Sequence, residues 1–233
     1  TQKIADALAN KTGWNVKIAM RYQFPSIKQA IEDFKNENID EIEVISLYPQ
    51  HAMSTTLSTA LEVKRVVNKY YPELKLNFVE PFYDHPDYIK ALSESIKPHL
   101  KKFDKLILSY HGIPMRHIKK SDVIGSHCEG SKSCCSSDNE AAHKCYRSNC
   151  YHTSKLTANY LNLNSNDKLI LWACPPINVE KECLDLKKVF SYLNDFVEKN
   201  INYKFIIRQH PNSKIFEKEF HIKNGLFCPK DLS

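Results

Sequence analysis

Residues 106 to 114 read Leu106-Ile107-Leu108-Ser109-Tyr110-His111-Gly112-Ile113-Pro114. From Lys105 to Tyr110 the chain is short and nearly all apolar, as expected of a strand that is buried on both faces within a parallel sheet. Gly112 lets the backbone turn directly afterwards. The run therefore predicts a strand that carries His111 to the end of a sheet, where a neutral imidazole can bind a metal or accept a proton. The alternative is a histidine that merely follows a strand.

Helical and extended patterns alternate along the rest of the chain. The expected strands are residues 16–20, 42–47, 74–79, 105–110, 169–173 and 203–208. The expected helices cover about 4–12, 27–34, 55–70, 86–96, 151–163 and 180–199. Ser26 with Gln29 forms a capping pair, and Gly13 is a helix stop. Repeated β–α units predict a doubly wound α/β architecture, with a boundary near residue 100 that gives domains 1–100 and 101–233.

Two further strand ends carry polar side chains. Arg21-Tyr22 follows one strand, and Tyr48-Pro49-Gln50-His51-Ala52-Met53-Ser54-Thr55-Thr56 follows the next. Ligands of such folds bind beyond the carboxyl ends of the strands. Arg21 can pair with a carboxylate, or it is a surface charge. The hydroxyl residues 54–56 can cap the next helix and leave N–H groups free for an anion, or they only cap it.

The segment from Gly112 to about Cys150 is expected to be long and irregular, which is typical of function or an insertion. Five of the eight cysteines fall within 23 residues of it: Cys128, Cys134, Cys135, Cys145 and Cys150. Thr1-Gln2-Lys3 does not read as a signal peptide, so dense cysteine favours a metal over a disulfide framework. Four thiolates can hold Zn²⁺ or an iron–sulfur cluster, with His127 or His143 replacing one in a zinc site. Free thiols or disulfides remain the alternative.

Together the three strand-end motifs resemble the ferrochelatase family over roughly residues 1–163. That family has an R-Y pair, a YPQ-x-x-x-STT segment and an S-[FY]-H-G-[IL]-P segment in this order. The resemblance implies a class II chelatase-like fold of two Rossmann-like halves, with Fe²⁺ inserted into proto- or coproporphyrin between them in haem synthesis. It makes His111 the essential histidine that meets the metal. It implies a porphyrin site lined by Arg21, Tyr22, Tyr48, His51, Ser54 and Thr55, although relatives often have Tyr in place of His51.

Related bacterial ferrochelatases carry similar cysteine-rich segments, here residues 123–150, and some family members hold [2Fe–2S]. The chain also departs from the family pattern. The family's first strand and Gly-rich loop are missing before Thr1, so we expect an incomplete fold. The C-terminal third, 164–233, lacks the family's Q-S-R and W-x-x-P segments. The family's essential Glu corresponds best to Asp185, with Glu182 as a rival. The favoured alternative is that Asp185 is only a surface carboxylate.

A fusion or frame change near residue 164 is a second explanation for that third. Residues 203–211 are similar to a strand-then-His-Pro segment of surface-polysaccharide glycosyl- or glycerophosphotransferases. In that case the chain is an inactive truncated or fused product. A non-catalytic relative that binds a tetrapyrrole or a metal is the other alternative to an enzyme.

Charge and composition limit the partners. The chain has 233 residues, a net charge of +6 and 26% charged residues. Lys alternates with Glu and Asp along most segments, which is typical of a solvated surface and argues against a nucleic-acid partner. The charge suits an anionic small molecule such as a porphyrin. No apolar run approaches the ~18 residues of a membrane span; peripheral membrane contact and the oligomeric state stay open. We expect a cytoplasmic protein.

Overall fold

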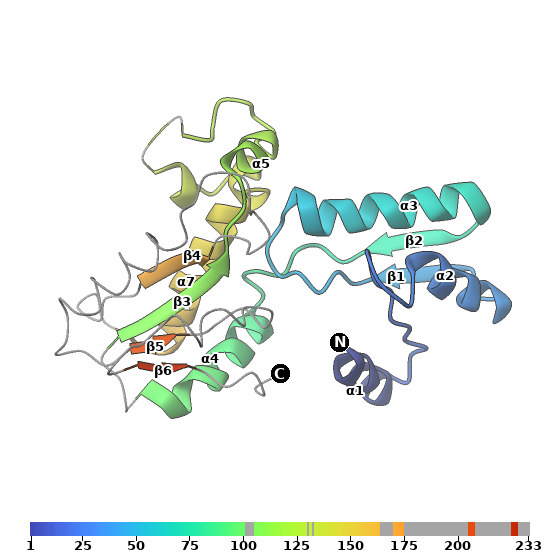
Figure 1. The fold of residues 1–233 in the computed structure, drawn as a ribbon, viewed down its shortest axis with the longest axis horizontal. Coiled ribbons are helices and arrows are strands. Elements are labelled where there is room, and N and C mark those ends of the chain that lie inside the picture. The colour runs from blue at the N-terminus through green and yellow to red at the C-terminus, as the bar shows by residue number, and fades with distance from the viewer. Residues whose placement is uncertain are drawn as a thin grey trace. The chain divides into compact units, whose positions relative to one another are not determined.

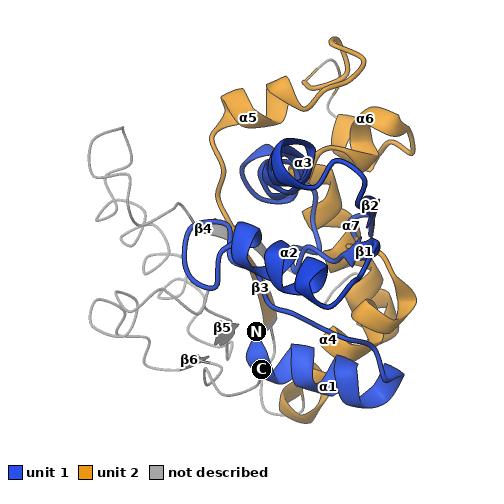
Figure 2. Ribbon diagram, turned by 90° about the vertical axis from the view of Figure 1, so that its right-hand side faces the viewer, with its two compact units in different colours: residues 1–81 blue, residues 82–233 orange. Residues whose placement is uncertain are grey.

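The computed structural model describes residues 1–100, 105–129, 131, 133–163, 170–174, 205–207 and 225–227. The chain divides into two compact units, Thr1–Pro81 and Phe82–Ser233, which Figure 2 shows in blue and orange. This division falls earlier than the boundary expected near residue 100. The reason is that helix α4 (Pro86–Leu100) packs on the second unit, where Ile96 meets Leu106 and Leu108 in one buried cluster.

The first unit is built around two parallel strands (Figure 1). Strand β1 (Glu41–Val44) pairs with β2 (Lys75–Phe78), with Ile42 opposite Leu76. Its helices are α1 (Gln2–Thr12), α2 (Ile27–Asn36), a π-helical turn η1 (Met53–Leu57) and α3 (Ser58–Tyr70). The apolar faces of α2 and α3 meet the strands in a core of Ile27, Ile31, Ile42, Val63, Val66, Val67 and Leu74.

Both helix-end signals of the sequence are confirmed in this unit. Gly13 has a φ of 72° and donates its N–H to the carbonyl of Ala9, which ends α1 in the left-handed conformation that glycine tolerates. Ser26 Oγ accepts from the backbone N–H of Gln29 at 3.1 Å and so caps α2. The side chain of Gln29 bonds Asp33 at 2.9 Å instead of returning to the cap.

The strand expected at residues 16–20 is wrong. This segment lies wholly in the described part of the chain, and it makes one isolated bridge, between Met20 and Ser26. The N–H of Met20 donates to the carbonyl of Pro25 at 2.8 Å. A strand needs a row of backbone partners, so local β-propensity at Val16 and Ile18 does not suffice to form one.

The second unit has a parallel sheet in the order β4-β3-β5-β6. Its strands are β3 (Lys105–His111), β4 (Ile170–Cys174), β5 (Phe205–Ile207) and β6 (Gly225–Phe227). Strand β3 is central, and Leu106, Ile107 and Leu108 are all buried. The expectation of a strand buried on both faces is confirmed. Its helices are α4, α5 (Met115–Lys120), a 3₁₀ turn η2 (Cys134–Ser136), α6 (Glu140–His143) and α7 (Tyr146–Tyr160).

The segment from Gly112 to Cys150 is less irregular than expected, since α5, η2, α6 and the start of α7 lie in it. Helix α7 begins five residues before the expected Tyr151. Its buried face is mostly polar, which hides it from a search for apolar periodicity. The buried residues of α7 are Ser148, Asn149, Cys150, Thr153, Ser154 and Thr157.

The prediction of an α/β protein with parallel strands is confirmed by both sheets. The finer assignment of two Rossmann-like halves stays a prediction. The helix expected at 180–199, with Glu182 and Asp185, lies outside the described residues. Among the helices that are described, none is long and apolar enough to cross a membrane.

Candidate functional site

His111 is the last residue of β3 and lies opposite Cys174 of β4. Its side chain is exposed. The chain then leaves the sheet through Gly112 and enters α5 after Pro114. The expectation that a buried strand carries an imidazole to the carboxyl end of a parallel sheet is thus confirmed, and ligands of α/β folds bind at such ends.

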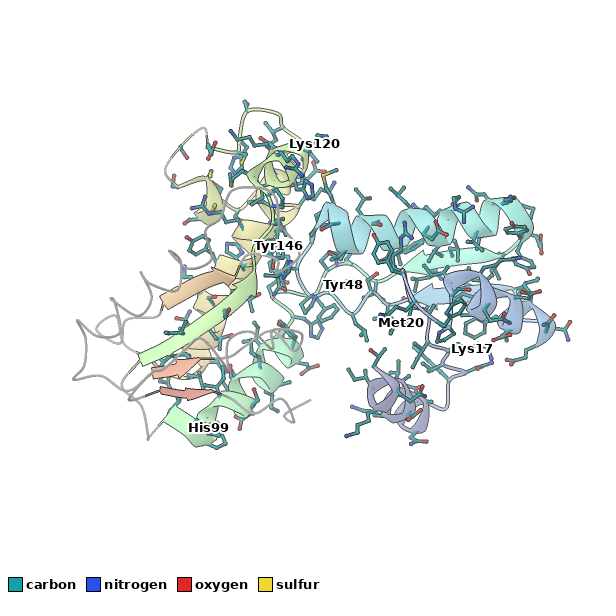
Figure 3. All side chains as sticks on the ribbon, in the orientation of Figure 1. Lys17, Met20, Tyr48, His99, Lys120 and Tyr146 are labelled. Atoms are coloured by element: carbon teal, nitrogen blue, oxygen red, sulfur yellow. The ribbon has the colours of Figure 1, made fainter. Side chains whose placement is uncertain are left out.

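Helix α7 packs against this end of β3. The hydroxyls of Tyr110 and Ser154 lie 2.9 Å apart. Tyr146 lies about two turns before Ser154 on α7, near Cys150 and Tyr110. Burial raises the pKa of Tyr146 well above its usual value, so the phenol stays protonated. Figure 3 labels this tyrosine. Sequence reasoning missed Tyr146, because it lies in the segment expected to be irregular.

Four of the five clustered cysteines line one pocket, hereafter the cysteine pocket. It lies between α5, η2 and the start of α7. Its lining residues are Met115, Ile118, Asp122, His127, Cys128, Glu129, Cys134, Cys135, Ala141, Cys145 and Arg147. The volume of this cavity is about 10 Å³, enough for roughly one water molecule. The pocket therefore has room for a single ion.

The fifth cysteine, Cys150, is 3% exposed and lies on α7 with Tyr146. In the pocket the sulfurs of Cys134 and Cys135 are 3.8 Å apart. Burial, followed by the neighbouring Cys134, raises the pKa of Cys135 to about 12. Burial and then the nearby Cys145 and Cys134 raise the pKa of Cys128. The raised pKa favours the protonated thiols of Cys128 and Cys135, and a bound cation would reverse that effect.

Several side chains that could bind a metal line the cysteine pocket, but they are not arranged as a coordination sphere. Across the described ranges, no three side chains of His, Cys, Asp and Glu are arranged to hold one metal ion. His127 Nε2 lies 2.9 Å from the carbonyl of Cys134, and its Nδ1 lies 3.4 Å from Asn139. His143 is held by Asp138 at 2.7 Å and by Tyr83 at 3.3 Å. Both rings thus have partners at both nitrogens, which disfavours either histidine as a substitute for a thiolate.

Asp122 organises the loop that brings Cys128 into the pocket. Its carboxylate accepts four backbone N–H bonds, from Ile124 at 3.0 Å, Gly125 at 3.1 Å, and His127 and Cys128 at 2.8 Å each. These bonds hold the pKa of the Asp122 carboxyl below its usual value, the one from Cys128 contributing most. The signal in the sequence is an Asp three residues before a Gly in a turn.

Replacing Asp122 by Ala should therefore loosen this loop and expose Cys128. We expect iodoacetamide to alkylate Cys128 about tenfold faster than in the wild type, because four backbone bonds no longer oppose local opening. Mass spectrometry of the peptide that contains Cys128 measures the rate. Asp84→Ala removes an exposed carboxylate of the same unit and should leave it unchanged. Equal rates in both variants and the wild type would show that Asp122 does not order the loop.

In the first unit, Arg21 and Tyr22 meet at Ser58, the first residue of α3. Arg21 Nε donates to Ser58 Oγ at 3.1 Å and to its carbonyl at 3.3 Å, and the Tyr22 hydroxyl lies 3.4 Å from the same Oγ. The guanidinium also lies over the Tyr22 ring, 4.6 Å from its centroid. Tyr22 is 76% exposed. Ser58 is a further candidate that the sequence did not mark.

The segment from Tyr48 to Thr56 differs from expectation. The cap expected at 54–56 is wrong, since Ser54, Thr55 and Thr56 lie inside the π-helical turn η1. Thr56 Oγ1 donates to the carbonyl of Ala52 at 2.9 Å and accepts its N–H at 3.0 Å. The N–H groups of Thr55 and Leu57 donate to that same carbonyl. These donors are therefore occupied, although π-turns are frequent at functional sites.

The remaining candidates of this segment are accessible to different degrees. Tyr48 and Ser54 are exposed, whereas His51 and Thr55 are half-buried. The Nδ1 of His51 lies 3.5 Å from Thr56 Oγ1. These residues and Arg21-Tyr22 belong to the first unit, and His111 belongs to the second. Their roles at a porphyrin, like that of Asp185, stay predictions.

Comparisons with known proteins agree with the motifs. The profile of the ferrochelatase family matches residues 1–173. Ferrochelatase of Stutzerimonas stutzeri (strain A1501) is 42% identical over 142 residues, which cover 60% of this chain and 42% of that protein. Ferrochelatase of Ectopseudomonas mendocina (strain ymp) is 39% identical over 160 residues, which cover 66% of this chain and 47% of that protein. The chain thus spans less than half the length of these curated relatives.

A structure of SirB from Bacillus subtilis with Fe³⁺ has a similar fold. The TM-score is 0.58 at 17% sequence identity, over 98% of this chain and 83% of that one. This likeness concerns the fold alone. The family match covers 173 of the 233 residues and includes all three strand-end motifs. This chain belongs to the ferrochelatase family.

Proposed function

We propose that this chain carries the metal-inserting site of a ferrochelatase, which places Fe²⁺ into proto- or coproporphyrin during haem synthesis. One observation carries the proposal: an exposed imidazole, His111, ends the central strand of a parallel sheet within the family's own motif. The chain spans under half of its relatives, so the activity of the whole protein is part of the proposal.

The chemistry needs a base beside the ring. Two pyrrole N–H protons must leave the porphyrin while Fe²⁺ loses its water ligands. A neutral imidazole can take one such proton or hold Fe²⁺ briefly, because it is a base near pH 7 and a borderline ligand. The exposure of His111 lets its proton pass on to solvent. A carboxylate opposite His111, for which Asp185 is our candidate and Glu182 its rival, would take the second.

The first unit holds side chains of the kinds that suit a porphyrin. A flat apolar macrocycle packs well on aromatic faces, and Tyr22 and Tyr48 are both exposed. The propionates of a porphyrin pair best with a guanidinium. Ser58 and the Tyr22 ring hold Arg21 in one orientation, which reduces the entropy lost on binding. In this proposal His51, Ser54 and Thr55 contribute less to porphyrin binding than Arg21 and the two tyrosines.

Replacing Arg21 by Ala should weaken porphyrin binding about tenfold, as expected when one charge-assisted hydrogen bond is lost. Quenching of porphyrin fluorescence measures the dissociation constant. Arg65→Ala is the matched control, because Arg65 lies on α3 and its guanidinium is already paired with Glu62 at 2.7 Å. If both variants bind porphyrin as the wild type does, Arg21 does not bind a propionate.

The second part of the proposal is a metal centre in the cysteine pocket, either a [2Fe–2S] cluster or Zn²⁺. Its donors would be Cys128, Cys134, Cys135 and Cys145, and Cys150 would stay outside. Thiolates are suitable ligands for both groups. The cavity of about 10 Å³ has room for a single ion, so a cluster would require the η2 turn and the Asp122 loop to move apart. A cluster would supply one-electron chemistry, whereas zinc would only cross-link the loops. Such thiolates need reducing surroundings, in keeping with the cytoplasm.

The decisive experiment incubates anaerobically purified protein with each porphyrin and Fe²⁺, Co²⁺ or Ni²⁺. The absorbance of haem reports insertion, and fluorescence reports binding. Haem formation supports a ferrochelatase. Porphyrin binding without haem favours a non-catalytic tetrapyrrole-binding relative, and neither result favours an inactive truncated or fused product. The short span of this chain relative to the curated ferrochelatases keeps both alternatives in view.

A further inference from the structure

A short loop in the first unit holds Arg21 against the start of α3. The loop is closed at its base, where the N–H of Met20 donates to the carbonyl of Pro25 at 2.8 Å (Figure 3 labels Met20). Arg21 Nε donates to Ser58 Oγ at 3.1 Å and to the Ser58 carbonyl at 3.3 Å. A single residue of α3 thus takes up the Nε–H of this guanidinium with two oxygens.

Tyr22 holds the same guanidinium from one of its faces. The centroid of its ring lies 4.6 Å from Arg21 Cζ, and its hydroxyl lies 3.4 Å from Ser58 Oγ. Ser58 Oγ therefore contacts both the cation and the aromatic residue that lies against it. A planar guanidinium that is held in this way loses little rotamer freedom when it binds a ligand.

The two terminal nitrogens of Arg21 are the donors that this arrangement leaves for a ligand. Within the described part of the chain, the hydrogen bonds of the Arg21 side chain all come from Nε. Glu62, whose pKa the charge of Arg21 helps to lower, bonds Arg65 through both carboxylate oxygens, at 2.9 and 2.7 Å. A carboxylate can pair with a guanidinium through Nε and one terminal nitrogen, or through both terminal nitrogens. Because Ser58 occupies Nε, the second geometry remains.

We propose that Ser58 is a positioning residue that occupies the Nε edge of Arg21 and presents its two terminal nitrogens to a free propionate, so that the protein selects porphyrins with ionised carboxylates over their esters. This inference rests on the function proposed above and adds the residue that sets its substrate selectivity. An ionised carboxylate accepts both N–H bonds and neutralises the cation. An ester offers a neutral carbonyl in its place, which pairs about half as strongly.

Fluorescence titration with protoporphyrin and with its dimethyl ester, in the same nonionic detergent, tests the selection. The wild type should bind the free acid about tenfold more tightly than the ester. Ser58→Ala should lower this preference to about threefold, because the hydroxyl no longer fixes the guanidinium while the carbonyl of residue 58 still accepts its Nε–H. Alanine is a strong helix former, so α3 should be kept. Ser58→Thr retains the hydroxyl and should restore the preference. Full preference in Ser58→Ala overturns the proposal.

A double-mutant cycle separates positioning from a direct contact between Ser58 and the porphyrin. Arg21→Ala should already abolish the preference, and adding Ser58→Ala to it should change neither affinity. If Ser58→Ala costs as much without Arg21 as with it, Ser58 acts on its own and the proposal is wrong. Thr59→Val is the matched control at the next position of α3. The buried hydroxyl of Thr59 has no hydrogen-bond partner among the described residues, so this variant should keep the wild-type preference.

Nitrogen-15 NMR of the Arg21 Nε–H group tests the positioning without any porphyrin. Its signal is assigned by its loss in Arg21→Lys, and its hydrogen exchange should be about threefold to tenfold faster in Ser58→Ala than in the wild type. Equal exchange rates overturn the positioning role.

The outcomes also separate this inference from the proposed function. If the wild type prefers the free acid but forms no haem, the proposed function fails and the selection by Arg21 stands. If it forms haem and binds acid and ester equally, the selection fails and the proposed function stands. If it binds neither porphyrin, both fail.

Discussion

Replacing His111 by Ala is expected to slow metal insertion by about 10²–10⁴-fold, the usual contribution of a positioned general base. Porphyrin affinity should change little, since the proposed grip on the ring comes from Arg21 and the exposed tyrosines of the first unit. The side chain is exposed at a strand end, so its removal leaves no cavity in the core. Initial rates of haem formation and fluorescence titration of the porphyrin measure the two effects separately.

A matched control separates the role of this imidazole from a general loss of histidine. His85 is also exposed, and its Nδ1 accepts the N–H of Asp87 at 3.3 Å at the start of α4. His85→Asn keeps an acceptor at that helix end and should retain the wild-type rate. Normal turnover by His111→Ala would remove His111 from the mechanism, however well the fold agrees with the family.

Replacing Cys134 and Cys135 together by Ser is expected to empty the cysteine pocket. Their sulfurs lie side by side at 3.8 Å, and a serine hydroxyl is a far poorer ligand for zinc or iron than a thiolate. Bound metal should fall by more than about tenfold, in line with the large share of folding free energy that thiolate sites draw from their metal. Any iron–sulfur absorbance should vanish with it. Elemental analysis and visible spectra of anaerobically purified protein give both readouts.

Cys150→Ala tests which four thiols are ligands. Cys150 is buried on α7 and contacts Tyr146, so its removal should leave metal content near the wild-type level. Loss of metal in Cys150→Ala together with its retention in the double variant would reverse our assignment. A wild type that is colourless and free of zinc would refute the metal centre itself, but it would leave the proposal for His111 untouched.

Local patterns were enough for the elements that place His111. A nearly all-apolar run of six residues, Lys105 to Tyr110, followed by His111 and Gly112, predicted a buried parallel strand and its end, and β3 agrees. Ser26 and Gly13 marked helix ends correctly, because a cap depends on hydrogen bonds between residues a few positions apart. The expected strand at 16–20 failed for the complementary reason, since strands need partners that the segment itself does not contain.

The sequence alone therefore established the family, the parallel α/β class and the position of His111, all of which follow from short motifs and local periodicity. Only the tertiary structure shows that Cys128, Cys134, Cys135 and Cys145 line one pocket and that Cys150 lies apart, near Tyr146. The fold also had to bury the polar face of α7, for example by a bond from Thr153 to the carbonyl of Tyr83, 70 residues away, at 2.7 Å. Contacts across such separations depend on how helices pack on the sheet, and no local pattern in the chain records that packing.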